Sequence, residues 1–183
     1  MMEILLTVLG LGIAAATFAA IIWSIARPTK RLWPPIRYTV LTPIFVWVPT
    51  FTLFGVLIAL GVLGWGDLNI PLLLRFGLGV PLILLGNVVV WGAVAGFGVR
   101  KTGGAADGLQ TDGLYRHSRN PQYMADVAMI LGWVVLTAAP LVAVVGFAAI
   151  IVLLAAPFSE EPWLRSQYGR KYDEYTAQVR RFF

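Results

Sequence analysis

The chain has 183 residues, of which 58% are hydrophobic and only 13% are charged, and its formal net charge is +5. A soluble domain of this length cannot bury so much apolar surface, so the composition excludes an ordinary soluble protein and predicts an integral membrane protein. The chain has no cysteine, which excludes disulfides, thiolate metal sites and cysteine nucleophiles, and its single histidine argues against a histidine-rich metal centre. We therefore expect no bound metal.

Three apolar stretches in the first half of the chain are long enough to cross a bilayer, for which a helix needs about 20 residues. The predicted spans are Ile4–Ala26, Tyr38–Leu63 and Pro71–Phe97. The first stretch is too long for the apolar part of a signal peptide and no basic residue precedes it, so we interpret it as a retained span. In the second span, Pro43 and Pro49 are expected to bend the helix.

Two shorter apolar stretches follow, Tyr123–Ala138 and Leu141–Ala156. Each is short for a full crossing, so they form either two tilted spans or a helical hairpin. We favour a hairpin that reaches the far side of the membrane at Pro140. The sequence thus predicts an all-α membrane protein with about five transmembrane helices, the last two a helical hairpin, followed by a C-terminal amphipathic helix.

The segment after the last apolar stretch has a helical pattern. Its apolar and aromatic residues recur at steps of three and four: Leu164, Tyr168, Tyr172, Tyr175, Val179 and Phe182. Ser159, before Glu160-Glu161 and Pro162, is typical of a helix start. Two interpretations stay open. The helix either lies on the lipid surface, or its tyrosine face closes a polar cavity at the ends of the last two spans.

The basic residues indicate an orientation. They cluster in three segments: Arg27, Lys30, Arg31 and Arg37; Arg100, Lys101, Arg116 and Arg119; and Arg165, Arg170, Lys171, Arg180 and Arg181. The positive-inside rule therefore predicts a protein of the cytoplasmic membrane with its N-terminus outside and its C-terminus in the cytoplasm. Arg75 falls elsewhere, and its long side chain is expected to snorkel outward. This topology accounts for the net charge, so nucleic acid is not expected as a partner.

We expect a single membrane domain over residues 1–183, in which residues 1–98 hold the three N-terminal spans and residues 123–157 the hairpin. The polar loop of residues 99–122 and the C-terminal helix of residues 158–183 share one face of the membrane. Chemistry in contact with water is expected there.

The loop and the tail together carry an ordered set of motifs. In chain order these are Gly113, Tyr115, Arg119-Asn120-Pro121, Tyr123, Glu160-Glu161, and Tyr168-Gly169 with Tyr172 and Tyr175. The set resembles the signature of the isoprenylcysteine carboxyl methyltransferase and phospholipid methyltransferase group of integral membrane enzymes. Asn120 stands where the prenyl-cysteine enzymes have histidine, and in this it is closer to bacterial members of the group.

The resemblance implies that S-adenosylmethionine binds at the cytoplasmic end of the last two spans and that a lipid or another lipophilic, membrane-partitioning acceptor arrives from the bilayer. It implies that Arg119, Glu160 and Glu161 are catalytic. It also implies a set of cofactor-binding residues, namely Leu109, Gly113, Tyr115, Arg119, Asn120, Pro121, Tyr123, Glu160, Glu161, Tyr172 and Tyr175. The residue types suit this role, because arginine can fork onto the carboxylate of the cofactor and tyrosine can face its sulfonium.

Other polar residues have simpler interpretations. Pro121 should begin the fourth predicted helix, with Asn120 as its cap, as a cofactor contact, or as both. Asn87 is expected to make an interhelical hydrogen bond. His117 is expected to be an exposed loop residue, and Asp126 should face a cavity or a partner because facing lipid would be costly.

If the acceptor requires a general base, the candidates are Glu160, Glu161, Asp126 and His117, and none is assigned because the acceptor is unknown. Two other functions are alternatives. A membrane reductase using NADPH is suggested by the stretch YMADVAMILGW, which is similar to the C-terminal region of the sterol reductases. A non-catalytic membrane scaffold is the second alternative.

Overall fold

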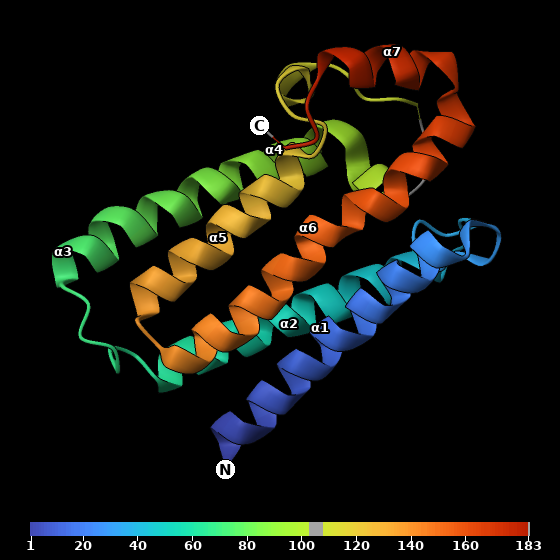
Figure 1. Ribbon diagram of the computed structural model, residues 1–183. Helices are drawn as coiled ribbons and strands as arrows, with labels where there is room; N and C mark the ends of the chain where they lie inside the picture. Colours follow the sequence, from blue (N-terminus) through green and yellow to red (C-terminus); the bar gives the residue numbers. More distant parts are fainter. Residues whose placement is uncertain (103–107, 183) are drawn as a thin grey trace.

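The computed structural model describes the backbone of residues 1–102 and 108–182, and the side chains of these residues except 96–102. All regular secondary structure within these ranges is helical (Figure 1). The main helices are α1 (Met2–Ala26), α2 (Thr42–Leu63), α4 (Val80–Thr102), α5 (Pro121–Thr137), α6 (Pro140–Tyr168) and α7 (Arg170–Gln178). Short helical segments are η1 (Pro28–Lys30), α3 (Leu72–Leu74), the π-helical η2 (Arg75–Gly79) and η3 (Gly113–Arg116). The polar loop expected over residues 99–122 is described in part, since residues 103–107 lie outside the described ranges.

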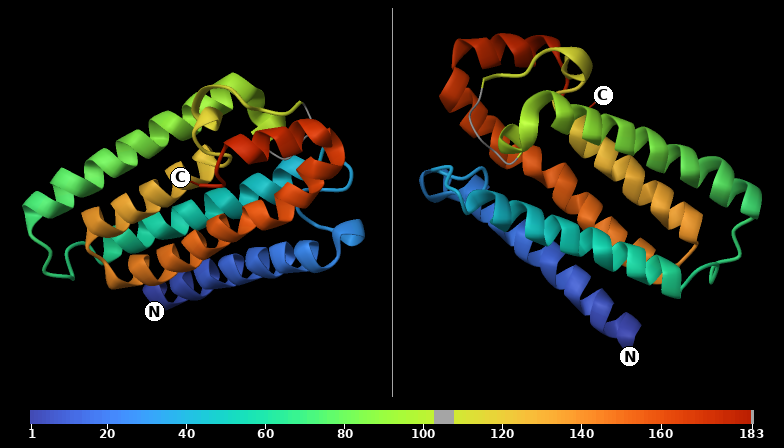
Figure 2. Two further views of the ribbon diagram at one scale, coloured as in Figure 1. Left: turned by 45° about the horizontal axis from the view of Figure 1, so that its top comes forward. Right: turned by 180° about the vertical axis from the view of Figure 1, so that it is seen from behind.

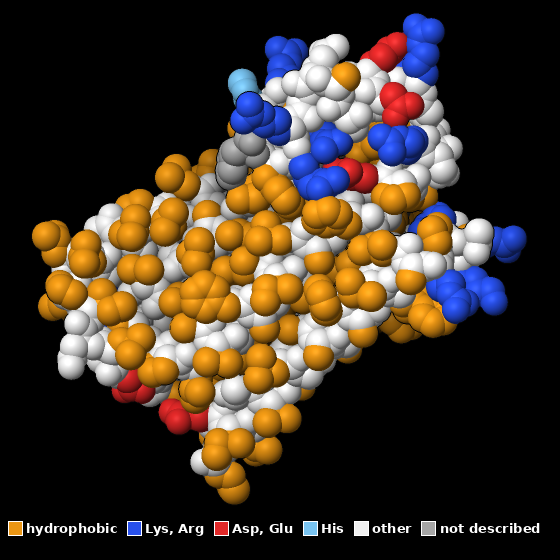
Figure 3. Space-filling view, viewed as in Figure 1, with side chains coloured by type: hydrophobic (Ala, Val, Ile, Leu, Met, Phe, Trp, Pro, Cys, Tyr) orange, Lys and Arg blue, Asp and Glu red, His pale blue; other side chains and the backbone are white. Residues whose placement is uncertain are grey.

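Among the described residues, four helical stretches are long and apolar enough to cross a membrane: Met2–Ala26, Thr42–Leu63, Leu72–Ala95 and Pro140–Tyr168. The shorter α5, with 17 residues, packs beside α4 and α6. Large hydrophobic side chains stay exposed along the flanks of the helices, while Lys and Arg gather toward the end that carries α7 (Figure 3). The protein is therefore an all-helical integral membrane protein, as the sequence predicts.

The helices α5 and α6 form the expected antiparallel hairpin, and they join at the end of the molecule opposite α7 (Figures 1 and 2). The turn depends on Ala138, which takes the left-handed conformation with φ 52°. Pro140 then occupies the first position of α6, where its missing N–H costs no hydrogen bond. The hairpin turn predicted at Pro140 is confirmed.

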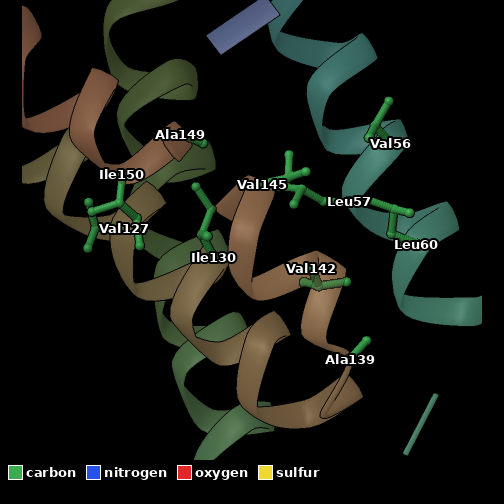
Figure 4. Packing of buried hydrophobic residues seen from close by; sticks show 10 residues of the cluster. All are labelled: Val56, Leu57, Leu60, Val127, Ile130, Ala139, Val142, Val145, Ala149 and Ile150. Atoms are coloured by element: carbon green, nitrogen blue, oxygen red, sulfur yellow. The ribbon is translucent and has the colours of Figure 1, made fainter. Parts of the chain in front are cut away.

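The buried core lies where α6 meets α2 and α5 (Figure 4). Val142 and Val145 of α6 are fully buried and point toward Leu57 and Leu60 of α2. On the other side of α6, Ile150 faces Val127 of α5. These branched side chains pack closely and join α6 to α2 and α5. Because α5 also packs against α4, the hairpin lies between the N-terminal helices and α4.

A close approach of two backbones fixes the position of α5 against the start of the third span. A Cβ atom on Gly79 would lie 2.8 Å from the carbonyl oxygen of Gly132, and one on Gly132 would lie 2.7 Å from that of Gly79. A side chain at either position would prevent this contact, so both residues have to be glycine. Small residues commonly allow membrane helices to pack this closely.

The structure corrects where the C-terminal helix begins. Ser159 was expected to start it, but α6 runs without interruption through Ser159 and Pro162 to Tyr168. The Ser159 hydroxyl donates to the carbonyl of Ala156, 2.9 Å away, instead of capping a new helix. The break comes at Gly169, whose φ of 52° lets the chain turn into α7.

Arg75 does not snorkel outward, and this prediction was wrong. Its side chain is buried, with 6% exposure, and lies against the C-terminal end of α5. Nε donates to the Leu136 carbonyl over 2.9 Å and Nη2 to the Thr137 carbonyl over 3.2 Å. The guanidinium also lies over the Trp65 ring, 4.9 Å from its centroid. These carbonyls lack helical partners and carry the negative end of the helix dipole, so they attract the cation inward.

Two smaller expectations also change. Asn87 donates to the Ile83 carbonyl of its own helix and accepts from Trp91, so its described hydrogen bonds are within α4 and not between helices. Pro43 lies in the first turn of α2, where it starts the helix, whereas Pro49 lies inside it.

Candidate functional site

The loop that precedes α5, the end of α6, α7 and the C-terminal segment Val179–Phe182 come together at one end of the molecule (Figure 2). The C-terminal segment is tied to the predicted motif by hydrogen bonds. The Arg119 N–H donates to the Arg180 carbonyl over 3.0 Å, and the Asn120 side-chain amide donates to the Arg181 carbonyl over 2.9 Å. These bonds place the chain's C-terminal residues directly against the start of α5.

Two arginines share one carboxylate at the centre of this region. Arg119 Nη2 lies 3.2 Å from Glu161 Oε1, and Arg181 binds both oxygens of Glu161 at 2.7 and 2.8 Å. The Arg119 and Glu161 side chains are only 13% and 16% exposed. Arg119 Nε is buried and has no hydrogen-bond partner among the described residues. The group therefore carries a net positive charge and an unused buried donor, which favours an additional anionic ligand.

Glu160 forms a second, neighbouring group. Its Oε1 accepts hydrogen bonds from the Tyr123 hydroxyl and, over 2.7 Å, from Trp33 Nε1. Trp33 belongs to the connection between α1 and α2, so the N-terminal half of the chain contributes to this region. Two donors hold the carboxylate in one orientation, which suits a positioning role better than proton transfer.

The tyrosines connect the loop to α7. The Tyr175 hydroxyl donates to the Tyr115 carbonyl over 2.7 Å, and the Tyr115 hydroxyl donates to the Gln122 side chain over 3.1 Å. Tyr172 is 1% exposed and its ring centroid lies 6.3 Å from that of Tyr175. The tyrosine face of the tail therefore packs inward onto the loop and does not lie on lipid, which favours the second of the two interpretations left open by the sequence.

Burial keeps these tyrosines neutral. It raises the pKa of Tyr175 to about 12, against a smaller opposing effect of the Arg119 charge. Burial, followed by the Glu161 carboxylate, raises the pKa of Tyr172 to about 12. The pKa of Tyr115 is raised further above its usual value by burial and by the Glu160 carboxylate. All three are hydroxyl donors at any physiological pH.

A hollow of about 370 Å³ lies between the loop and the tail. It is lined by Gly108, Leu109, Thr111, Tyr168, Lys171 and Glu174. Its volume falls within the range of small-molecule sites, about 300–1,000 Å³. Of the predicted cofactor residues only Leu109 lines it. Arg119 is paired with Glu161, and Glu160 is bonded to Tyr123 and Trp33.

The other predicted site residues have backbone roles in the structure. Gly113 has a φ of 63° and begins η3, so it supplies a left-handed conformation. Pro121 begins α5 as expected, but the Asn120 side chain does not cap that helix and binds Arg181 instead. His117 is exposed, as predicted. Asp126 is half-buried and makes no hydrogen bond or ion pair with any described residue.

Sequence reasoning missed Trp33 and Arg181 as members of this region. Trp33 lies 127 positions from Glu160, and nothing local distinguishes it from other interfacial tryptophans. Arg181 follows the tyrosine pattern of the tail, and its charge was assigned only to membrane orientation. Within residues 1–102 and 108–182, no group of three or more His, Cys, Asp and Glu side chains is arranged to hold a metal ion.

Comparison with known proteins gives one family. The family model described as phospholipid methyltransferase matches residues 74–171, which is more than half of the chain. The match runs from the third span to the start of α7 and contains both the loop motif and Glu160-Glu161. No curated protein and no solved structure gives a significant match.

Proposed function

Because the chain belongs to the phospholipid methyltransferase family, we propose that it transfers a methyl group from S-adenosylmethionine to a lipophilic or membrane-partitioning acceptor. The observation that carries the proposal is the family match, which spans the hairpin together with the loop motif and the acid pair. Membrane methyltransferase activity is common to the family. The identity of the cofactor, its position and the class of acceptor go beyond the family match and are our proposal.

The hollow between the loop and α7 is the part of the site that we assign to the nucleoside of the cofactor. Leu109 and Tyr168 offer apolar and aromatic surface for an adenine ring. Glu174 is bound to Arg170 over 2.7 Å, but a carboxylate has further acceptor positions for ribose hydroxyls. Tyr168 and Glu174 replace Gly113 and Pro121 as our candidates for direct contact.

The Arg119–Glu161–Arg181 group is the part that we assign to the amino-acid head of the cofactor. Two guanidinium groups share a single carboxylate, so a second carboxylate would balance the charge. It would also satisfy the buried Nε of Arg119, whose lack of a partner costs about 1–3 kcal/mol in the unliganded protein. This unused donor is the structural feature that best fits the cofactor.

When bound, S-adenosylmethionine supplies an electrophilic methyl group on a sulfonium with a good leaving group. The chain then has to orient the acceptor in line and exclude water. Glu160, held in one orientation by Tyr123 and Trp33, is a fixed acceptor that can orient a donor group of the cofactor or of the acceptor. Where the acceptor must lose a proton, we assign that role to Asp126, because Glu160 and Glu161 are occupied and His117 is exposed.

We assign the end of the molecule that carries α7 to the cytoplasm. The three clusters of Lys and Arg at the ends of the spans support this orientation by the positive-inside rule. The cofactor would then enter from the cytosol, where it is made available in water, and the acceptor from the membrane.

Ligand-dependent thermal stability tests the proposal. Purified protein in detergent should be stabilised by S-adenosylhomocysteine, by about 2.7 kcal/mol at a hundredfold excess over Kd, and not by NADPH. Stabilisation by NADPH instead would favour a reductase, and no response to either would favour a scaffold. A radiolabelled methyl group should then pass from S-adenosylmethionine to a component of host membrane extract, and identification of that component gives the acceptor.

A further inference from the structure

A second hollow, of about 250 Å³, lies on another part of α6, between this helix and the connection from α1 to α2. Its lining residues are Ser24, Pro28, Thr29, Arg31, Ser159, Pro162, Trp163 and Ser166. It shares none of them with the hollow assigned to the nucleoside. The surface is mostly apolar, with hydroxyl groups and one guanidinium.

The connection that forms one wall is held in a fixed shape. The hydroxyl of Ser24, a residue only 3% exposed, accepts hydrogen bonds from the N–H groups of Leu32 and Trp33, both over 3.0 Å. Trp33 then anchors the same segment to Glu160 on α6 over 2.7 Å. Arg31 lies between these anchoring points, so its backbone is fixed before any ligand arrives.

Arg31 is the one lining side chain of this hollow with a positive charge, and its charge is not neutralised within the described protein. Nε donates to the Pro34 carbonyl over 2.9 Å and Nη1 to the Pro28 carbonyl over 3.3 Å. Of the five N–H donors of a guanidinium, three therefore remain, and no described carboxylate pairs with them. Burial lowers the pKa of Arg31, as expected for a cation without a nearby anion.

The sequence around the hollow also lacks negative charge. No Asp or Glu occurs in residues 4–66, whereas Arg27, Lys30 and Arg37 surround Arg31 on the same connection. Glu160 and Glu161, the nearest acids along α6, are both occupied by other donors. An anion is the missing partner, and a phosphate matches the fork of a guanidinium.

Exposed apolar side chains on the two segments that contribute Ser24 and Arg31 to the hollow indicate which kind of anion fits. Trp23, Leu32 and Ile36 are 45%, 61% and 55% exposed, and they lie in the last turns of α1 and on the connection that follows it. A phosphate that enters here would bring acyl chains alongside them. We infer that this hollow binds the phosphate of an anionic phospholipid, as a resident lipid separate from the methyl-transfer site.

The test uses the full chain, purified in a neutral detergent without cofactor and titrated with phosphatidylglycerol or phosphatidylcholine of the same acyl composition. Lipid retention is measured by native mass spectrometry. We expect preferential retention of phosphatidylglycerol, and Arg31→Gln should weaken it about tenfold to a hundredfold, the effect of losing a charge-assisted pair. Arg37→Gln removes the same charge from an exposed position of the same connection. It should cost less than about fivefold, the attraction of one surface cation.

A second pair of variants leaves Arg31 intact. Ser166→Leu should fill the hollow and reduce retention, whereas Gln167→Leu, at an exposed neighbouring position outside the lining, should not. The inference would be overturned if the protein retained the two lipids equally. It would also be overturned if the two arginine variants lost equal affinity, or if Ser166→Leu had no effect. Competition by glycerol phosphate at the affinity of the lipid would also overturn it, since the site would then recognise a soluble phosphate. Because no cofactor is present, failure here leaves the proposed methyl transfer untouched.

Discussion

An arginine lies at each end of α5, Arg75 buried and Arg119 half-buried, and their surroundings differ. Arg75 contacts the C-terminal end of the helix, where it binds two backbone carbonyls and an aromatic ring, and none of its buried nitrogens lacks a partner. Arg119 precedes the N-terminal end, shares Glu161 with Arg181, and retains a buried nitrogen without a partner. The fold alone supplies the partners of Arg75, whereas the Nε donor of Arg119 is left for a ligand.

Burial of an arginine in a membrane protein therefore does not by itself indicate function. A cation that donates hydrogen bonds to the unpaired carbonyls at the end of a helix stabilises the fold. A cation that is buried and incompletely bonded indicates a ligand, because the cost of the missing bond is recovered only when a ligand binds. Four predictions test this distinction, in order of decreasing effect.

Arg75→Ala should cause the largest change, and it should affect stability alone. The carbonyls of Leu136 and Thr137 lose their side-chain donors, which should lower the free energy of unfolding by about 2–4 kcal/mol. The measurement is thermal unfolding in detergent, with Arg170→Ala as the control because that side chain is 91% exposed. Affinity for S-adenosylhomocysteine per folded molecule should not change. A stable Arg75→Ala protein that no longer binds the ligand would contradict the distinction.

Arg119→Ala should act in the opposite way. Loss of a charge-assisted contact should weaken S-adenosylhomocysteine binding about tenfold to a hundredfold, while Arg181 continues to pair with Glu161. Binding is measured by titration calorimetry or by the ligand-dependent shift in melting temperature. Arg116→Ala, on the same loop and with a side chain 71% exposed, is the matched control. If both variants bind as well as the unmodified protein, our assignment of the amino-acid head is wrong.

Trp33→Phe removes one neutral hydrogen-bond donor from Glu160, the acid next to Glu161. Glu160 keeps its bond from Tyr123, so the expected loss is about 1 kcal/mol in stability. Trp23→Phe is the control, because its Nε1 donates to the Lys30 carbonyl away from the site. Methyl transfer should fall more in Trp33→Phe than in Trp23→Phe. Equal activity of the two would mean that the contact with Glu160 is structural only.

The smallest effect near neutral pH is expected for Tyr172→Phe. The folded protein holds the pKa of Tyr172 and Tyr175 at about 12, above the usual value near 10, so neutral tyrosines favour the folded state. Their contribution is complete below pH 10 and is lost as the pH rises from about 10 to 12. The melting temperature of the unmodified protein should therefore fall in this interval, and that of Tyr172→Phe should fall less. Identical alkaline profiles would show that Tyr172 is not buried as described.

The sequence predicted the elements whose cause is local. Apolar length predicts the spans, and Ala138 to Pro140 predicts the hairpin turn because proline starts a helix more easily than it continues one. The same local rule failed at Ser159 and Pro162, where α6 continues. A proline is tolerated inside a membrane helix when neighbouring segments satisfy the freed backbone groups.

Contacts between distant segments could not be predicted in the same way. Arg75 needs the carbonyls of α5, which lie about sixty positions away, and Trp33 needs Glu160, which lies 127 positions away. The motif from Gly113 to Tyr123 indicated the right end of the molecule. Pairing of Arg119 with Glu160 or Glu161 as a structural clamp was one interpretation of that arginine, and the structure pairs it with Glu161. Pairing of this kind depends on how helices pack, which a single sequence does not specify.

The hydrogen bonds that join Arg119 and Asn120 to the C-terminal segment have a consequence for biosynthesis. Asn120 finds its acceptor at Arg181, 61 positions later, so this hydrogen bond can form only after the chain has been synthesised through Arg181. Both helices of the hairpin are therefore synthesised before the contacts of the C-terminal segment with the loop can form. A fusion partner attached directly after Arg181 would compete for the same space, and a tag at the opposite terminus is the better choice for preserving activity.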